Sequence, residues 1–186
     1  AMAAVLRDLE HFKTDEVILL GDHLDCGGWL AQNHTLGYVA ETETSFEDDV
    51  EATNSFLDEL QKRTPGAKTH FIAGNHEARI ERFCVTAALR STKDASFLLR
   101  RIGPQYVLQL EKRGINFYHR GTQYCGLPIP GTLQLGKCIF THPSDAPKYA
   151  ASAFLKKFGG NLVFGHTHRV DATIGFSVTA GTIGAW

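Results

Sequence analysis

Short continuous apolar runs alternate along this chain with longer segments of helical periodicity. Apolar runs without alternation predict strands covered on both faces. One helix is predicted strongly: its apolar positions recur every three or four residues from Phe46 to Leu60, and Ser45 with Asp48 has the pattern of a capping box. Strands that alternate with helices predict an α/β fold. The predicted strands cover residues 16–22, 68–77, 137–142 and 161–168.

The remaining pattern predicts further helices and a second set of strands. Helices are expected over 3–12, 78–90, 94–102 and 146–158, and residues 26–44 have no clear period and are expected to form a long loop. Short β-type runs separated by Gly and Pro predict a second sheet or a β-rich flank. These runs cover residues 105–110, 115–119 and 132–135. A last strand over 176–184 is expected to close the chain after the strand over 161–168.

Composition narrows the class of protein. The 186 residues suit one domain, and the net charge of −1 provides no global attraction to nucleic acid or to an anionic membrane. No apolar run approaches the roughly 20 residues that a membrane span needs, and no secretory signal is visible. The four cysteines form no C-x-x-C pair. We therefore expect a cytoplasmic protein with reduced thiols.

Polar residues follow four of the predicted strands directly. The endings are "LLGDHLD", "FIAGNHE", "IFTHP" and "VFGHTH". In open α/β sheets, sites form at the carboxyl ends of the strands. Oxygen and imidazole donors without thiolate suit Mn, Fe, Zn or Ni. If the pleat continues past the last strand, its two histidines point to one side. The candidate residues are Asp22, Asp25, Asn75, His76, His142, His166 and His168.

Each ending taken alone has an ordinary interpretation. A lone histidine usually lies on the surface, and a Gly-Asp or Gly-Asn pair usually forms a turn. Four such endings in one chain favour a shared site, although a histidine cluster without metal stays open. The zincin pattern H-E-x-x-H fails at Ile80, and no phosphate loop, dinucleotide fingerprint or G-x-S-x-G elbow is present.

In order and spacing, these motifs resemble the calcineurin-like metallophosphoesterases from about residue 16 to the end. The resemblance implies two packed mixed β-sheets flanked by helices, in a four-layer αββα sandwich, with two divalent metal ions bridged by Asp22. Asn75, His142 and His166 would complete the shell of one metal, and His168 would bind the other. His76 matches the general acid or phosphate-binding histidine, and Asp25 matches the residue that orients it.

The chemistry of phosphoester hydrolysis agrees with these roles. Two cations about 3.5–4 Å apart neutralise the phosphate and activate water near neutral pH. An imidazole at His76 can protonate the leaving oxygen, with Asp25 stabilising its charged form. Arg79, one turn into the following helix, is a candidate phosphate-binding residue, with a surface salt bridge as the alternative. Mn is the expected metal, with Fe, Zn and Ni as alternatives.

The substrate stays open from the sequence. Trp29 or Tyr38 in the loop over 26–44 could stack on a base, although packing over the sheet is the ordinary interpretation. Small phosphoesters, nucleotides, phosphoproteins and nucleic-acid ends all fit, as monoesters or diesters. The sequence predicts no membrane partner and leaves the oligomeric state open.

One family motif is missing. The family begins with Asp-x-His at the end of its first strand, whereas Asp8 and His11 are three apart in a helical pattern. The sequence therefore predicts a single domain over 1–186 that is incomplete at its first strand and at its carboxyl end. One metal then has four ligands and the other only Asp22 and His168, so we expect one metal in this chain and two in the parent protein. The alternative function is a catalytically impaired metal-binding or partner-binding domain, which an upstream Asp-x-His strand would exclude.

Overall fold

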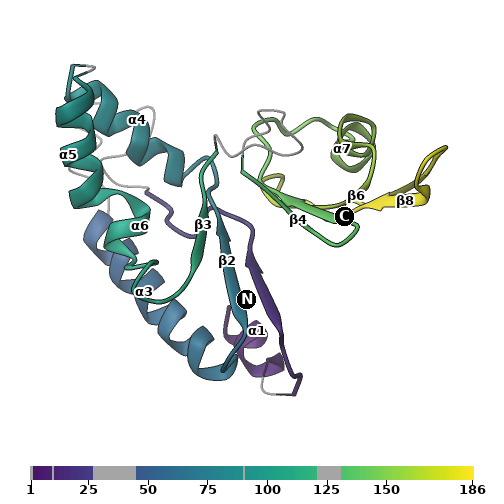
Figure 1. The fold of residues 1–186 in the computed structure, drawn as a ribbon, viewed down its shortest axis with the longest axis horizontal. Coiled ribbons are helices and arrows are strands. Elements are labelled where there is room, and N and C mark those ends of the chain that lie inside the picture. Colours follow the sequence, from purple (N-terminus) through teal and green to yellow (C-terminus); the bar gives the residue numbers. More distant parts are fainter. Residues whose placement is uncertain (1, 10, 27–44, 90, 121–130) are drawn as a thin grey trace. The chain divides into compact units, whose positions relative to one another are not determined.

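The computed structural model describes residues 2–9, 11–26, 45–89, 91–120 and 131–186 (Figure 1). The chain divides into two compact units, each described here by itself. The first unit contains Ala1–Leu19, His23–His70 and His76–Phe117. The second contains Leu20–Asp22, Phe71–Asn75 and Tyr118–Trp186. Both units are therefore assembled from segments far apart in the sequence.

Helices make up much of the first unit, and several of their apolar residues are buried. They are α1 (Met2–Asp8), α3 (Phe46–Arg63), α4 (Glu77–Ala87), α5 (Thr92–Ile102) and α6 (Pro104–Val107). Helix α4 packs on α5, as Figure 1 shows. Leu57 and Leu60 of α3 are buried, and so are Ile80 of α4 and Leu108, which follows α6. Strands β1 (Glu16–Leu19), β2 (Lys68–Ile72) and β3 (Asn116–Tyr118) form a three-stranded sheet in that order.

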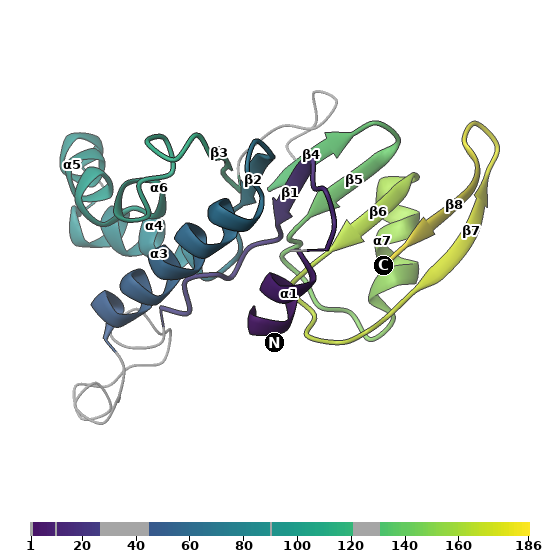
Figure 2. The ribbon, with the colours of Figure 1, turned by 90° about the horizontal axis from the view of Figure 1, so that it is seen from below.

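The second unit contains a mixed five-stranded sheet with one helix packed on it. The sheet order is β4-β5-β6-β8-β7; β6 runs parallel to β5 and β8, and the outer pairs β4–β5 and β7–β8 are antiparallel. Helix α7 (Ala150–Phe158) packs on β6, β7 and β8 (Figure 2). Phe154 of α7 meets Phe164 of β6 edge to face, with 4.9 Å between ring centroids. The strands are β4 (Thr132–Leu135), β5 (Cys138–Thr141), β6 (Asn161–Phe164), β7 (Thr173–Ser177) and β8 (Gly181–Ala185).

The predicted α/β class with two sheets flanked by helices is confirmed. Helix α3 begins as predicted, because Ser45 and Asp48 form a reciprocal capping box. The predicted loop over 26–44, which includes Trp29 and Tyr38, lies outside the described residues except for Cys26.

Two of the predicted strands are wrong. Residues 105–110 form the end of α6 and a turn, because Pro104 stands at the first helical position and Leu108 and Leu110 bury their side chains through the turn. Residues 176–184 are the end of β7, a turn and most of β8, so that one predicted strand is an antiparallel hairpin.

No helix in the described part of the chain is long and apolar enough to cross a membrane. Among the described cysteines, Cys26, Cys84 and Cys138 are free.

Candidate metal centre and catalytic residues

The centre of the candidate site is the imidazole of His142, one residue after β5 in the second unit. Its Nε2 lies 3.2 Å from Asp22 Oδ2, 2.9 Å from Asn75 Oδ1 and 3.2 Å from His166 Nδ1. The candidate metal-binding atoms of Asp22, His142 and His166 all lie within 4.8 Å of one another. The structure thus brings together the four residues that the sequence assigned to a single metal.

Hydrogen bonding fixes the tautomer of this imidazole. His142 Nδ1 lies 2.6 Å from the carbonyl oxygen of Leu20. A carbonyl oxygen only accepts, so Nδ1 carries the proton, and Nε2 of the neutral ring presents a lone pair. Metal-binding histidines are held in this way, with the second ring nitrogen donating to a backbone carbonyl or a carboxylate.

This tautomer makes the cluster suited to a cation. The lone pair of Nε2 faces two oxygens and a second imidazole nitrogen, so four electron-rich atoms converge. The side chain of His142 is 1% exposed and that of Asp22 is 11% exposed, so little water reaches these donor atoms. Two oxygens and two imidazole nitrogens are a donor set for divalent Mn, Fe, Zn or Ni. The residues present therefore fit a divalent metal ion.

Glycines before Asn75 and His166 let these loops approach each other closely. A Cβ atom on Gly74 would lie 2.5 Å from the backbone nitrogen of Asp22 and would overlap its Oδ1. A Cβ atom on Gly165 would lie 2.8 Å from the Leu20 carbonyl oxygen. Any larger residue at either position would force the loops apart. Glycine before the polar residue is therefore a requirement of the packing in "GNHE" and "GHTH".

The backbone at the strand ends is strained. Asp22 has a φ of 56°, His166 of 79° and His168 of 51°, values that residues other than glycine rarely adopt. Such conformations cost of the order of 1–3 kcal/mol each and persist where surrounding contacts enforce them. The strained conformation turns the Asp22 and His166 side chains toward His142.

The expectation that a continuing pleat aligns His166 with His168 is wrong. Strand β6 ends at Phe164, and both histidines have left-handed backbone conformations. His166 joins the cluster because the chain turns there, whereas His168 is not part of the group formed by Asp22, His142 and His166. Nothing in the described geometry places His168 on a metal.

Burial is the main cause that lowers the pKa of His166. The charges of His142, Arg120 and His168 lower this pKa further, while the carboxylate of Asp22 raises it. The imidazole therefore stays neutral, which is the form that binds metal, to a lower pH than an exposed histidine.

In the first unit, His76 and Asp25 form a pair. His76 Nδ1 lies 3.2 Å from Asp25 Oδ1, and the His76 side chain is 18% exposed. This is the pairing that a general acid with an orienting carboxylate requires. The two side chains therefore lie within ion-pair distance, and their roles in catalysis stay predictions.

Glu77 holds the segment that carries Asp25. Its buried carboxylate accepts hydrogen bonds from the backbone N–H groups of His23 at 2.8 Å and Leu24 at 3.0 Å. Thr53 donates its hydroxyl to the His23 carbonyl at 2.9 Å. The sequence interpretation gave Glu77 no role, although its place next to His76 in "GNHE" was a usable signal.

Helix α3 supplies a further hold on this segment. Asp49 Oδ2 accepts from the Cys26 backbone N–H at 2.9 Å. Arg79, the predicted phosphate-binding residue, donates to the Asp25 carbonyl oxygen at 3.3 Å. Asp49 and Thr53 lie about 25 residues along the chain from Asp25, so no local motif could have identified them.

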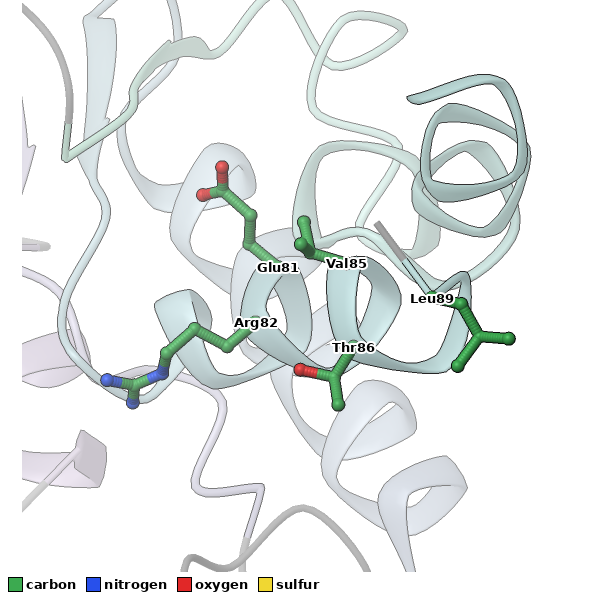
Figure 3. Close-up of a pocket in the computed structure, with 5 residues that line it drawn as sticks. All are labelled: Glu81, Arg82, Val85, Thr86 and Leu89. Atoms are coloured by element: carbon green, nitrogen blue, oxygen red, sulfur yellow. The ribbon is translucent and has the colours of Figure 1, made fainter. Parts of the chain in front are cut away.

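A hollow of about 620 Å³ lies elsewhere, along one face of α4 (Figure 3). Figure 3 shows the side chains of Glu81, Arg82, Val85, Thr86 and Leu89 around it. None of the candidate site residues lines this hollow, so we do not connect it with the metal centre.

Comparison with known proteins identifies the family of the chain. No curated protein and no solved structure matches the chain significantly. The family model described as calcineurin-like phosphoesterase matches residues 1–170, which is most of the chain. This family comprises metal-dependent phosphoesterases, in agreement with the donor cluster around His142. The chain therefore belongs to the calcineurin-like phosphoesterase family.

Proposed function

We propose that this protein hydrolyses phosphoesters at a dinuclear metal centre, with Mn as the preferred metal. The observation that carries the proposal is the orientation of His142, whose Nδ1–H is directed to the Leu20 carbonyl oxygen and whose Nε2 lone pair is directed into the donor cluster. A histidine that serves only packing has no need of three electron-rich neighbours. Membership of a phosphoesterase family supports the reaction class.

The ligands divide between two metals in this proposal. Asn75, His142, His166 and Asp22 would hold one metal. Asp22 and His168 would hold the second. Bound divalent ions would neutralise the negative charge of the phosphate and activate water.

The other chemical groups belong to the first unit. His76 donates a proton to the leaving oxygen, and Asp25 holds its ring and stabilises the charged form. Glu77 and Asp49 fix the backbone around Asp25, so that the carboxylate keeps its distance from His76. The substrate is a small phosphoester, a nucleotide or the end of a nucleic acid.

Metal binding and hydrolysis test the proposal together. The protein is titrated with Mn by calorimetry and assayed on p-nitrophenyl phosphate and on bis-p-nitrophenyl phosphate. His142→Ala should remove most of the Mn binding and the hydrolysis, whereas His168→Ala should remove much less of the binding. His76→Asn should keep Mn binding and lose activity by about a hundredfold or more. His11→Asn, which replaces an exposed histidine, is the matched control and should change neither Mn binding nor hydrolysis.

The outcomes separate the alternatives. Mn binding that depends on His142 without hydrolysis of any ester in a wide panel would favour the catalytically impaired binding domain. If protein purified without chelator contains no metal and binds none on titration, the histidine cluster has a structural role only. Equal loss of binding in His142→Ala and His168→Ala would show that the division of ligands is wrong.

A further inference from the structure

A positively charged side chain of the second unit contacts the loop that follows the metal ligand His142. Arg120 follows β3 by two residues and is partly buried. Its charge is among those that lower the pKa of His166, after burial and the charge of His142. A cation next to metal-binding imidazoles opposes metal binding, so its presence there calls for an explanation.

Backbone hydrogen bonds tie the position of Arg120 to the metal ligands. The Gly131 N–H donates to the carbonyl oxygen of His119 at 3.3 Å, and the His142 N–H donates to the carbonyl oxygen of Gly131 at 3.4 Å. Gly131 thus links the segment that carries Arg120 to the segment that carries His142. The site for the guanidinium is consequently built into the same unit as the cluster.

A side-chain hydrogen bond sets the direction of the guanidinium. Arg120 Nη2 donates to Ser144 Oγ at 2.9 Å, and Ser144 lies two residues after the ligand His142. Guanidinium presents five N–H donors in a rigid fork suited to phosphate oxygens. The Ser144 contact holds one arm of this fork next to the loop that carries the metal ligand.

We propose that Arg120, held by Ser144, is a phosphate-binding residue that gives the site a preference for phosphomonoesters. This inference rests on the proposed function. The position of a guanidinium beside a metal cluster is explained if an anion is the third component of the site. A cation beyond the metals stabilises the doubly charged monoester more than the singly charged diester, since Coulomb attraction grows with ligand charge. A monoester also carries three unesterified oxygens and a diester two, so the monoester has one more acceptor for the guanidinium.

Binding of inorganic phosphate tests the inference without catalysis. Calorimetry first measures Mn affinity and then phosphate affinity of the Mn-loaded protein. Arg120→Ala should keep or slightly raise Mn affinity, because a repelling cation is removed, and should weaken phosphate binding by about tenfold or more. The phosphate affinity of Arg120→Lys should lie between those of the unmodified protein and Arg120→Ala. Ser144→Ala should weaken phosphate binding only about two- to fivefold. Arg100→Ala on α5 removes an exposed arginine of equal charge in the first unit and should change neither affinity.

Kinetics test the preference between esters. Arg120→Ala should lower kcat/KM for p-nitrophenyl phosphate by about tenfold and that for bis-p-nitrophenyl phosphate by no more than about twofold. Unchanged phosphate affinity, equal losses on both esters, or loss of Mn binding in Arg120→Lys as well as in Arg120→Ala would overturn the inference. If the unmodified protein binds phosphate through Arg120 but hydrolyses neither ester, the proposed function fails while phosphate binding by Arg120 stands.

Discussion

At the residue scale, a single methyl group should disable the metal site. A Cβ atom at position 74 would overlap the backbone nitrogen and the carboxylate of Asp22. We expect Gly74→Ala to lower Mn affinity by about a hundredfold or more, because two of the four ligands are displaced together. Calorimetric titration with Mn measures the loss.

Gly66→Ala is the matched control for this substitution. Gly66 has a φ of +82°, and a Cβ atom there would meet no other atom within 4 Å, so the control introduces backbone strain without a clash. It should lower the free energy of unfolding and leave Mn affinity unchanged. Wild-type affinity in Gly74→Ala would show that the loops around Asp22 and Asn75 are not held as close as the structure describes.

At the scale of elements, the capping box of α3 should make stability depend on pH. Asp48 accepts from the Ser45 backbone N–H at 2.7 Å and from the Ser45 hydroxyl at 2.7 Å, which together lower the pKa of Asp48. A carboxylate with a lowered pKa stabilises the folded state above its unfolded pKa, near 3.9, and loses that contribution as the pH falls through the folded pKa.

Asp48→Ala should therefore lower the urea midpoint of unfolding at neutral pH. The difference from the unmodified protein should shrink below about pH 4. Ser45→Ala also removes the oxygen that accepts from the Asp48 backbone N–H at 3.1 Å, a contact that does not titrate, so much of its cost of about 1 kcal/mol should persist below pH 4. Only the part that comes from the hydrogen bond of the hydroxyl to the Asp48 carboxylate should be lost there. Glu51→Ala, on the exposed surface of α3, serves as the control. A deficit for Asp48→Ala that does not change with pH would contradict the assignment of the carboxylate to the cap.

The same scale explains how far the sequence could predict the structure. Helix α3 was predictable because its period and cap are local properties of residues 45–63. The turn at 108–110 was not, because an alternation of Leu108 and Leu110 fits either a strand or a turn, and only packing in the first unit decides between them. The hairpin β7–β8 was missed because "VTA" between the strands contains no strong two-residue turn signal.

Some residues of the candidate site were predictable from the sequence and others were not. Asp22, Asn75, His142 and His166 could be selected because each follows an apolar run, and parallel strands end at a common edge. Their mutual distances depend on left-handed backbone at Asp22 and His166, which no local pattern predicts. Asp49, Thr53 and Arg120 act through contacts with distant segments, so they emerge only from the folded chain.

At the scale of the whole molecule, metal should stabilise one unit more than the other. The four donors come from all three segments of the second unit, 20–22, 71–75 and 118–186. A metal bound to them cross-links these segments in the folded state alone. At a hundredfold excess over Kd this linkage is worth about 2.7 kcal/mol, which corresponds to a rise in Tm of about 5–10 °C for a chain of this size.

Hydrogen exchange followed by mass spectrometry locates that stabilisation. With Mn in excess over chelator, we expect slower exchange in peptides from β5 and β6, which carry His142 and His166 at their ends, and unchanged exchange in α5 of the first unit. Asp22→Asn, which removes a carboxylate from the cluster, should abolish the difference. Equal slowing in α5 would mean that the two units unfold as one cooperative body, so that the metal stabilises both. No slowing in β5 or β6, with Mn bound, would place the metal outside the cluster around His142.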